Sequence, residues 1–85
     1  MKNKYEVEIE KNTIILEKTK KLQKIIKKDL FIEIPTYIID EIVVGGRKQN
    51  IIALITLAKV NNRITEEEAK IFIKNLDKYM LIYRL

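Results

Sequence analysis

The N-terminal residues alternate apolar and acidic side chains. Tyr5, Val7 and Ile9 are separated by single glutamates, which is the period of a half-buried strand. Lys11-Asn12 is suited to a turn, after which residues 13–16 form a returning strand. The pattern therefore predicts a β-hairpin over residues 5–16. The alternative is a helix that begins here, with Asn12 or Thr13 as its N-cap.

The apolar period changes to that of a helix over residues 18–30. One face of this helix carries Leu22, Ile25, Ile26 and Leu30, and the opposite face carries Lys20, Lys24, Lys27 and Lys28. Residues 18–28 contain six lysines and no acid. The pattern predicts a basic amphipathic helix.

The middle of the chain contains two further helical patterns. After residues 31–34, a connector or short strand before Pro35, a short helix is predicted over 36–44 and ends at Gly45-Gly46. Residues 48–60 carry apolar side chains nearly all round the helical circumference. Such a pattern is typical of a buried helix, so we expect residues 48–60 to form the central helix of the core.

A last helix is predicted over residues 65–80. Thr65 and Glu68 have the spacing of a capping box, in which each side chain accepts a hydrogen bond from the other residue's amide. The predicted inward face comprises Ala69, Phe72, Ile73, Leu76, Met80 and Tyr83. Residues 79–85 are apolar on more than one face, which predicts either a strand paired with residues 5–9 or an oligomer interface formed by Leu81, Ile82 and Leu85.

These elements predict a single domain over residues 1–85. Its fold class is mainly α, a compact three- to four-helix domain with a small N-terminal β-hairpin (α+β). A chain of 85 residues buries only about 60% of the surface that its unfolded form exposes. Because it contains no cysteine for disulfides, it depends on a dense aliphatic core or on oligomerisation.

The residue types exclude most catalytic chemistry. The chain has no histidine, no cysteine and no serine, so it lacks the common nucleophiles and the side chain that titrates near neutral pH. The carboxylates of Asp40, Glu41 and the Glu66–Glu68 run remain, but a helix start explains that run. We expect no enzyme activity, no catalytic residue, no cofactor, no metal site and no small-molecule substrate.

The positive charge favours an acidic partner. The net charge is +5 and the isoelectric point is about 9.5. The candidate contacts with phosphate or an acidic partner are Lys20, Lys24, Lys27, Lys28, Arg47 and Lys48. The alternative for the lysine face is an ordinary solvated helix surface, and for Gly45-Gly46 before Arg47 a plain corner between two helices. No stretch has the length and apolarity of a membrane span, and we expect a cytoplasmic protein without a membrane partner.

Two segments resemble known families. Residues 30–57 resemble the ribbon-helix-helix repressors in their order of strand, proline, helix, glycine turn and helix. The resemblance places Asp29, Phe31 and Glu33 where that family reads DNA, and acidic or apolar side chains do not suit that role. Ile64 to Glu68 with the preceding helix resembles the C-terminal SHOCT-type helical hairpin. Neither segment is long enough to assign a family.

Two functional hypotheses follow. The first is a small regulatory protein that acts through protein–protein contacts, by self-association or as an adaptor or inhibitor of a larger partner, like many compact mobile-element proteins. The second is a nucleic-acid-binding accessory protein whose lysines contact phosphates. The acidic start of the last helix disfavours base reading by a helix-turn-helix, because phosphates repel Glu66, Glu67 and Glu68.

Overall fold

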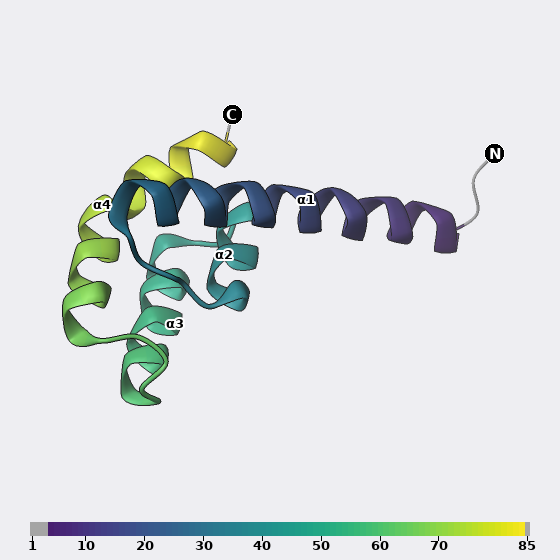
Figure 1. Ribbon diagram of the computed structural model, residues 1–85. Coiled ribbons are helices and arrows are strands. Elements are labelled where there is room, and N and C mark those ends of the chain that lie inside the picture. Colours follow the sequence, from purple (N-terminus) through teal and green to yellow (C-terminus); the bar gives the residue numbers. More distant parts are fainter. Residues whose placement is uncertain (1–3, 85) are drawn as a thin grey trace.

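Four helices make up the described part of the chain, residues 4–84 of the computed structural model. They are α1 (Lys4–Leu30), α2 (Thr36–Val43), α3 (Lys48–Val60) and α4 (Glu66–Arg84), with no strand among the described residues. Helices α2, α3 and α4 gather beside the C-terminal half of α1, while its N-terminal half extends away from them (Figure 1). The molecule is accordingly elongated, at 49 × 24 × 19 Å.

The predicted N-terminal hairpin is wrong, because residues 5–16 belong to α1. The alternative start at Asn12 or Thr13 is also wrong, since α1 begins at Lys4. Three alternating apolar residues are too few to distinguish a strand from a helix. Glutamate, lysine and leucine, which are frequent in this segment, are good helix formers. With no glycine or proline before Pro35, nothing separates this segment from the helix predicted over 18–30.

Helix α1 ends at a bulky residue in a left-handed conformation. Phe31 has a φ of +57°, and its amide donates to the carbonyl of Lys27 over 3.0 Å, which closes the last turn. The chain then runs through residues 31–35 as an irregular connector that buries Ile32 and Ile34. The Gln23 side chain donates to the carbonyl of Ile34 over 3.0 Å and ties this connector to α1.

The short helix α2, rather than α3, is the central element. Helix α2 packs against each of the other three helices and buries Ile38, Ile39 and Ile42. Helix α3 contacts α2 and α4, and it leaves Leu57 and Val60 53% and 67% exposed. Helix α3 buries Ile51, Ile55 and Ala58, but it is not the central helix of the core that was expected. An apolar circumference shows what a helix is able to bury, but the number of neighbouring helices determines what it does bury.

The start of α4 confirms the predicted capping box. The Thr65 amide donates to Glu68 Oε1 over 2.9 Å, and the Glu68 amide donates to Thr65 Oγ1 over 3.1 Å. On the inward face Ala69, Phe72, Leu76 and Met80 are buried, while Ile73 is half-buried. The side chain of Tyr83 lies outside the described residues.

Tyr79 is a core residue that the sequence interpretation missed. It is fully buried, and its ring stacks on that of Phe72 with 6.1 Å between the centroids. Its hydroxyl donates to Asp29 Oδ2 over 3.3 Å, which links α4 to the end of α1. Burial, followed by the nearby Asp29 carboxylate, raises the pKa of the Tyr79 hydroxyl. The sequence did contain a signal for this burial, because the spacing of Phe72, Leu76 and Tyr79 places all three on one face of the helix.

The predicted C-terminal strand is also wrong, since α4 continues as a helix to Arg84. The alternative, an interface, remains a prediction for Leu81 and Ile82. Leu85 lies outside the described residues.

Candidate interaction surfaces

A projecting arm, residues 8–18 of α1, is the most exposed part of the molecule. Every side chain described between Glu8 and Lys18 is exposed, except that of Ile15, which is half-buried. Ile14 and Leu16 are each 51% exposed although both are large and apolar. Successive residues on a helix point about 100° apart. One neighbouring surface therefore cannot cover all three members of the Ile14-Ile15-Leu16 run.

The body of the molecule begins at Thr19, where α1 first becomes buried. Thr19 is 1% exposed and donates from its hydroxyl to Asp40 Oδ1 of α2 over 2.7 Å. Leu22 and Ile26, about one and two turns further on, are fully buried. The Thr19–Asp40 hydrogen bond therefore marks the boundary between arm and body and fixes the direction in which the arm leaves.

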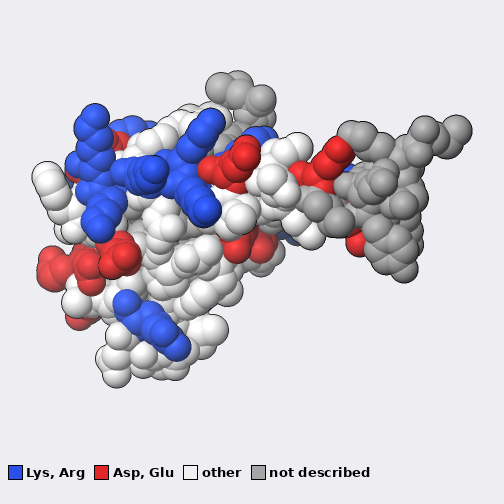
Figure 2. All heavy atoms as spheres, turned by 45° about the vertical axis from the view of Figure 1, so that its right-hand side comes forward, with Lys and Arg blue, Asp and Glu red and all other residues white. Residues whose placement is uncertain are grey.

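Three of the predicted lysines line one groove. Lys20, Lys24 and Lys27 are exposed and border a groove of about 230 Å³ together with Gln23 and Glu33. Lys28 is also exposed, on the same half of α1. Figure 2 shows lysines gathered over this half of α1, and acidic side chains along the part that projects. We call Lys20, Lys24, Lys27 and Lys28 the lysine surface. Glu33 gives the groove one negative charge at its edge.

The structure does not bring Lys48 to the lysine surface. Lys48 forms an ion pair with Asp77 of α4, with 2.9 Å between Nζ and Oδ1. Helix α4 lies on the Asp29 side of α1, where Lys78 and Tyr79 contact that carboxylate. Asp29 and Lys27 are two residues apart, and therefore point about 160° apart around α1. The six cations predicted as one contact set thus occupy more than one face.

The amides of Gly45 and Gly46 are used to end α2. Gly45 has a φ of +83° and donates to the carbonyl of Ile42 over 3.1 Å, while Gly46 donates to that of Glu41 over 2.8 Å. These two bonds form a Schellman motif. The Glu41 side chain also packs against Gly46 where a Cβ would stand. The Gly45-Gly46 segment is therefore a corner between two helices. The Glu41 carboxylate beside it would repel a bound anion.

Two apolar patches lie on the body. Leu81 and Ile82 are 61% and 44% exposed, and Leu81 borders a groove of about 400 Å³ with Lys48, Asp77 and Met80. On α3, Ala53, Leu57 and Val60 are exposed and form a stripe at helical spacing. The sequence interpretation placed Leu57 and Val60 in the core. Both patches are short compared with the arm.

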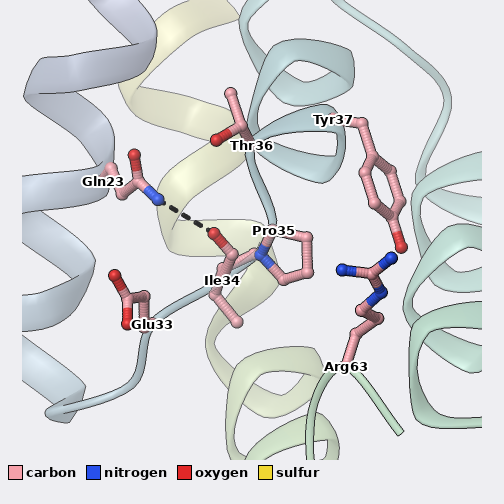
Figure 3. A pocket seen from close by; sticks show the side chains of 7 residues that line it. All are labelled: Gln23, Glu33, Ile34, Pro35, Thr36, Tyr37 and Arg63. Carbon is pink, nitrogen blue, oxygen red and sulfur yellow. Dashed lines mark hydrogen bonds between the residues drawn. The ribbon is translucent and has the colours of Figure 1, made fainter. Parts of the chain in front are cut away.

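A shallow pocket of about 410 Å³ lies where the connector meets the turn before α4. In Figure 3 the Arg63 guanidinium and the Tyr37 hydroxyl point toward each other, and Gln23 bonds to the connector on the opposite side. Glu33 and Thr36 complete its polar lining. Sequence reasoning did not single out this pocket, because its residues come from four segments of the chain. Arg63 and Glu33 carry opposite charges, so the lining selects neither anions nor cations.

Neither a metal cluster nor a membrane span is found in the described part of the chain. No group of three or more carboxylates there is arranged to hold a metal ion, and none of the described helices combines the length and apolarity needed to cross a bilayer. Comparison of the chain with protein-family models, with curated proteins and with solved structures gives no match. The functional argument therefore rests on the chain's own surfaces.

Proposed function

We propose that this chain is a small, non-enzymatic regulatory protein that acts through protein–protein contacts. The observation that carries the proposal is the arm, which presents Ile14 and Leu16 to solvent on a part of α1 whose described side chains are all exposed except that of Ile15. Large apolar side chains exposed together are typical of surfaces that another protein covers. The absence of histidine, cysteine and serine supports the non-enzymatic part, and the absence of cysteine suits a reducing location such as the cytoplasm.

The helical state of the arm adds a second argument. An isolated helix shorter than about 12–15 residues is marginal in water, because nucleation is costly and no tertiary contact repays it. The arm precedes Thr19 and makes up about three turns of α1. A partner that covers Leu16 would supply the missing burial, so binding and helix formation in the arm support each other.

Site-specific photocrosslinking tests this function. A photoreactive residue replaces Leu16 in the full chain, Leu57 or Leu81 in parallel variants, and exposed Lys70 in a matched control. In a lysate of the source cells we expect a discrete adduct from position 16 and none from position 70. Equal, diffuse labelling at positions 16 and 70, or no adduct from any of the three apolar positions, would contradict the proposal.

A second candidate function is phosphate binding by the lysine surface. It is favoured by the convergence of Lys20, Lys24 and Lys27 on one groove. Each neutralised phosphate of duplex DNA steepens the dependence of log K on log salt by about 0.9. If all three lysines contact phosphates, replacing them with alanine lowers this slope by roughly 3, while Lys70→Ala leaves it unchanged. The absence of binding to duplex or single-stranded DNA at low salt would eliminate this function.

A further inference from the structure

The end of α1 carries an aromatic residue that the packing of the fold does not explain. Phe31 is 88% exposed, the largest exposed fraction among the large apolar side chains of the described residues. It also has a φ of +57°, a conformation in which a bulky residue is an outlier. Glycine is the usual residue at such a helix end, because it has no Cβ to strain the backbone. Phe31 therefore strains the backbone and gains little burial in return.

The backbone on both sides of Phe31 is anchored to the body. Leu30 before it is half-buried, and Ile32 after it is only 4% exposed. Strained residues that persist in a fold are concentrated at binding sites and ligand clamps. An exposed ring on an anchored backbone offers a flat apolar face on which another ring can stack. The place and exposure of Phe31 thus suit the binding of a planar group.

The lysine surface leads along α1 to Phe31. One line along the helix carries, at intervals of four, three and four residues, Lys20, Lys24, Lys27 and Phe31. At about 100° per residue, these four positions lie within roughly 60° around the helix axis. The Phe31 amide still bonds to the Lys27 carbonyl over 3.0 Å, so the Phe31 Cα keeps its helical place, about 6 Å along the axis from Lys27. Three cations and an exposed ring therefore follow each other on one side of α1.

The acids near this line leave it positively charged. Glu33 borders the groove together with Lys20, Lys24 and Lys27, so the lining carries three positive charges and one negative charge. Asp29, two residues before Phe31, is paired with Lys78 over 3.2 Å. The row of lysines can accordingly attract phosphate groups, and the uncharged ring follows at its end.

We infer that the lysine surface and Phe31 form one site for single-stranded nucleic acid. The lysines contact phosphates of the strand, and an unpaired base stacks on the Phe31 ring. Proteins that bind single strands combine a basic path with aromatic rings in this manner, because every unpaired base has a free face. In a duplex the interior bases are stacked on their neighbours, so Phe31 adds nothing to duplex binding. The inference deepens phosphate binding by the lysine surface, the second candidate function, and rests on it.

An anionic membrane fits the same surface less well. Helices that lie on membranes insert an apolar face beneath a basic one. The apolar face of this half of α1 is already used, because Leu22 and Ile26 are fully buried in the body. Phe31 alone would then have to enter the lipid.

Removal of the ring tests the site. The affinity of the full chain for a short labelled oligothymidylate, an oligouridylate and a DNA duplex is measured by fluorescence anisotropy. Phe31→Leu, which keeps an apolar side chain without the ring, is expected to weaken binding of the single strands about tenfold and to leave duplex binding unchanged. Phe31→Tyr keeps the ring and the affinity. Ile71→Ala, at an exposed apolar position of α4, is the matched control and has no effect.

The salt dependence separates the ring from the lysines. Phe31→Leu removes no charge, so the slope of log K against log salt for a single strand stays the same. Lys24→Ala is expected to lower that slope by about 0.7.

Tryptophan provides an independent readout, since the chain contains none. The emission of Phe31→Trp is expected to be quenched when oligothymidylate is added, because a base stacks on the indole, whereas that of Ile71→Trp is not. An oligonucleotide of the same length without bases should bind the unaltered chain and Phe31→Leu equally.

The outcomes distinguish the site from the function on which it rests. If Phe31→Leu binds both single strands as tightly as the unaltered chain, the inference is overturned, while phosphate binding stands as long as Lys24→Ala lowers the slope. If no oligonucleotide binds, both are refuted. Binding to anionic phospholipid vesicles that depends on Phe31, without binding of oligonucleotides, also overturns the inference. Binding of oligothymidylate or oligouridylate alone, weakened by Phe31→Leu, supports the inference and identifies the ligand as DNA or RNA.

Discussion

The two halves of α1 belong to one continuous helix but are stabilised in different ways. From Thr19 onward the helix is held by buried side chains and by a hydrogen bond to α2, whereas the arm before it has none of its described large side chains buried. The charge changes sign at the same place. The difference teaches that one continuous helix serves two structural roles here: one half builds the core, and the described side chains of the other half stay at the surface.

The largest expected effect on stability comes from truncating a side chain in the core, and it is compared with the same kind of truncation in the arm. Ile38 is fully buried in α2, so Ile38→Ala should lower the free energy of unfolding by about 4 kcal/mol at any protein concentration. Leu16→Ala should lower it far less, because Leu16 is 51% exposed and packs against little of its own chain. Denaturant titrations at two protein concentrations measure both. An equal loss in dilute solution for the two variants would remove the distinction.

The boundary between the halves is tested by Thr19→Val. This change keeps the shape of the side chain but leaves the Asp40 carboxylate without its 2.7 Å hydrogen bond, so we expect a loss of about 2 kcal/mol. Thr56→Val, the same change at an exposed position of α3, provides the matched control and should cost far less, because the Thr56 hydroxyl bonds to the Ile52 carbonyl of its own helix over 3.0 Å and not to a buried partner in another helix. Urea denaturation followed by circular dichroism measures the difference. Similar losses for both variants would show that the Thr19 bond does not anchor α1.

The link between α1 and α4 is tested through the ionisation of Tyr79. Because its folded pKa is raised, its contribution is complete below the unfolded pKa of about 10 and is lost as pH rises from there toward the folded pKa. Tyr79→Phe should cost about 1 kcal/mol at pH 7, and this difference should shrink above pH 10. Denaturation curves of both proteins at pH 7 and 10.5 measure this difference. Lysine titration affects both proteins alike, so it cancels in the comparison. A difference that grows with pH would contradict the assignment.

The smallest effect concerns the end of α1. Phe31 is 88% exposed and adopts a left-handed conformation, so its side chain contributes little burial while its Cβ strains the backbone. Phe31→Gly should raise the free energy of unfolding by about 0.5 kcal/mol, the relief of strain less the entropy that glycine loses. Phe31→Ala, which retains the Cβ, should not give this gain. Thermal melts of the three proteins distinguish these outcomes.

Local signals in the sequence predicted the helix ends well. The spacing of Thr65 and Glu68 predicted the capping box, and Gly45-Gly46 predicted the end of α2, since each depends on a few adjacent residues. The helical face of Leu22 and Ile26 was also predicted, and both are buried. Such features are determined within one or two turns of the chain.

Features that depend on distant segments were not predicted. The alternation of Tyr5, Val7 and Ile9 is compatible with a strand as well as with a helix, and three alternating residues do not decide between them. The apolar circumference of α3 gave no sign that just two helices cover it. Asp29 and Tyr79 are fifty residues apart, so their contact was not accessible to a reading of periodicity. The predicted cations of the site divided between faces for the same reason.

The position of α2 has a consequence for how this chain folds. Helix α2 has eight residues, too few to persist alone, yet every other helix packs against it. Its formation must therefore coincide with the arrival of α1, α3 and α4, and substitutions in it should slow folding as well as accelerate unfolding. The body then folds in a single cooperative transition, while the arm frays and reforms independently. Hydrogen exchange should accordingly be fast in the arm and slow, with one common opening energy, in the body.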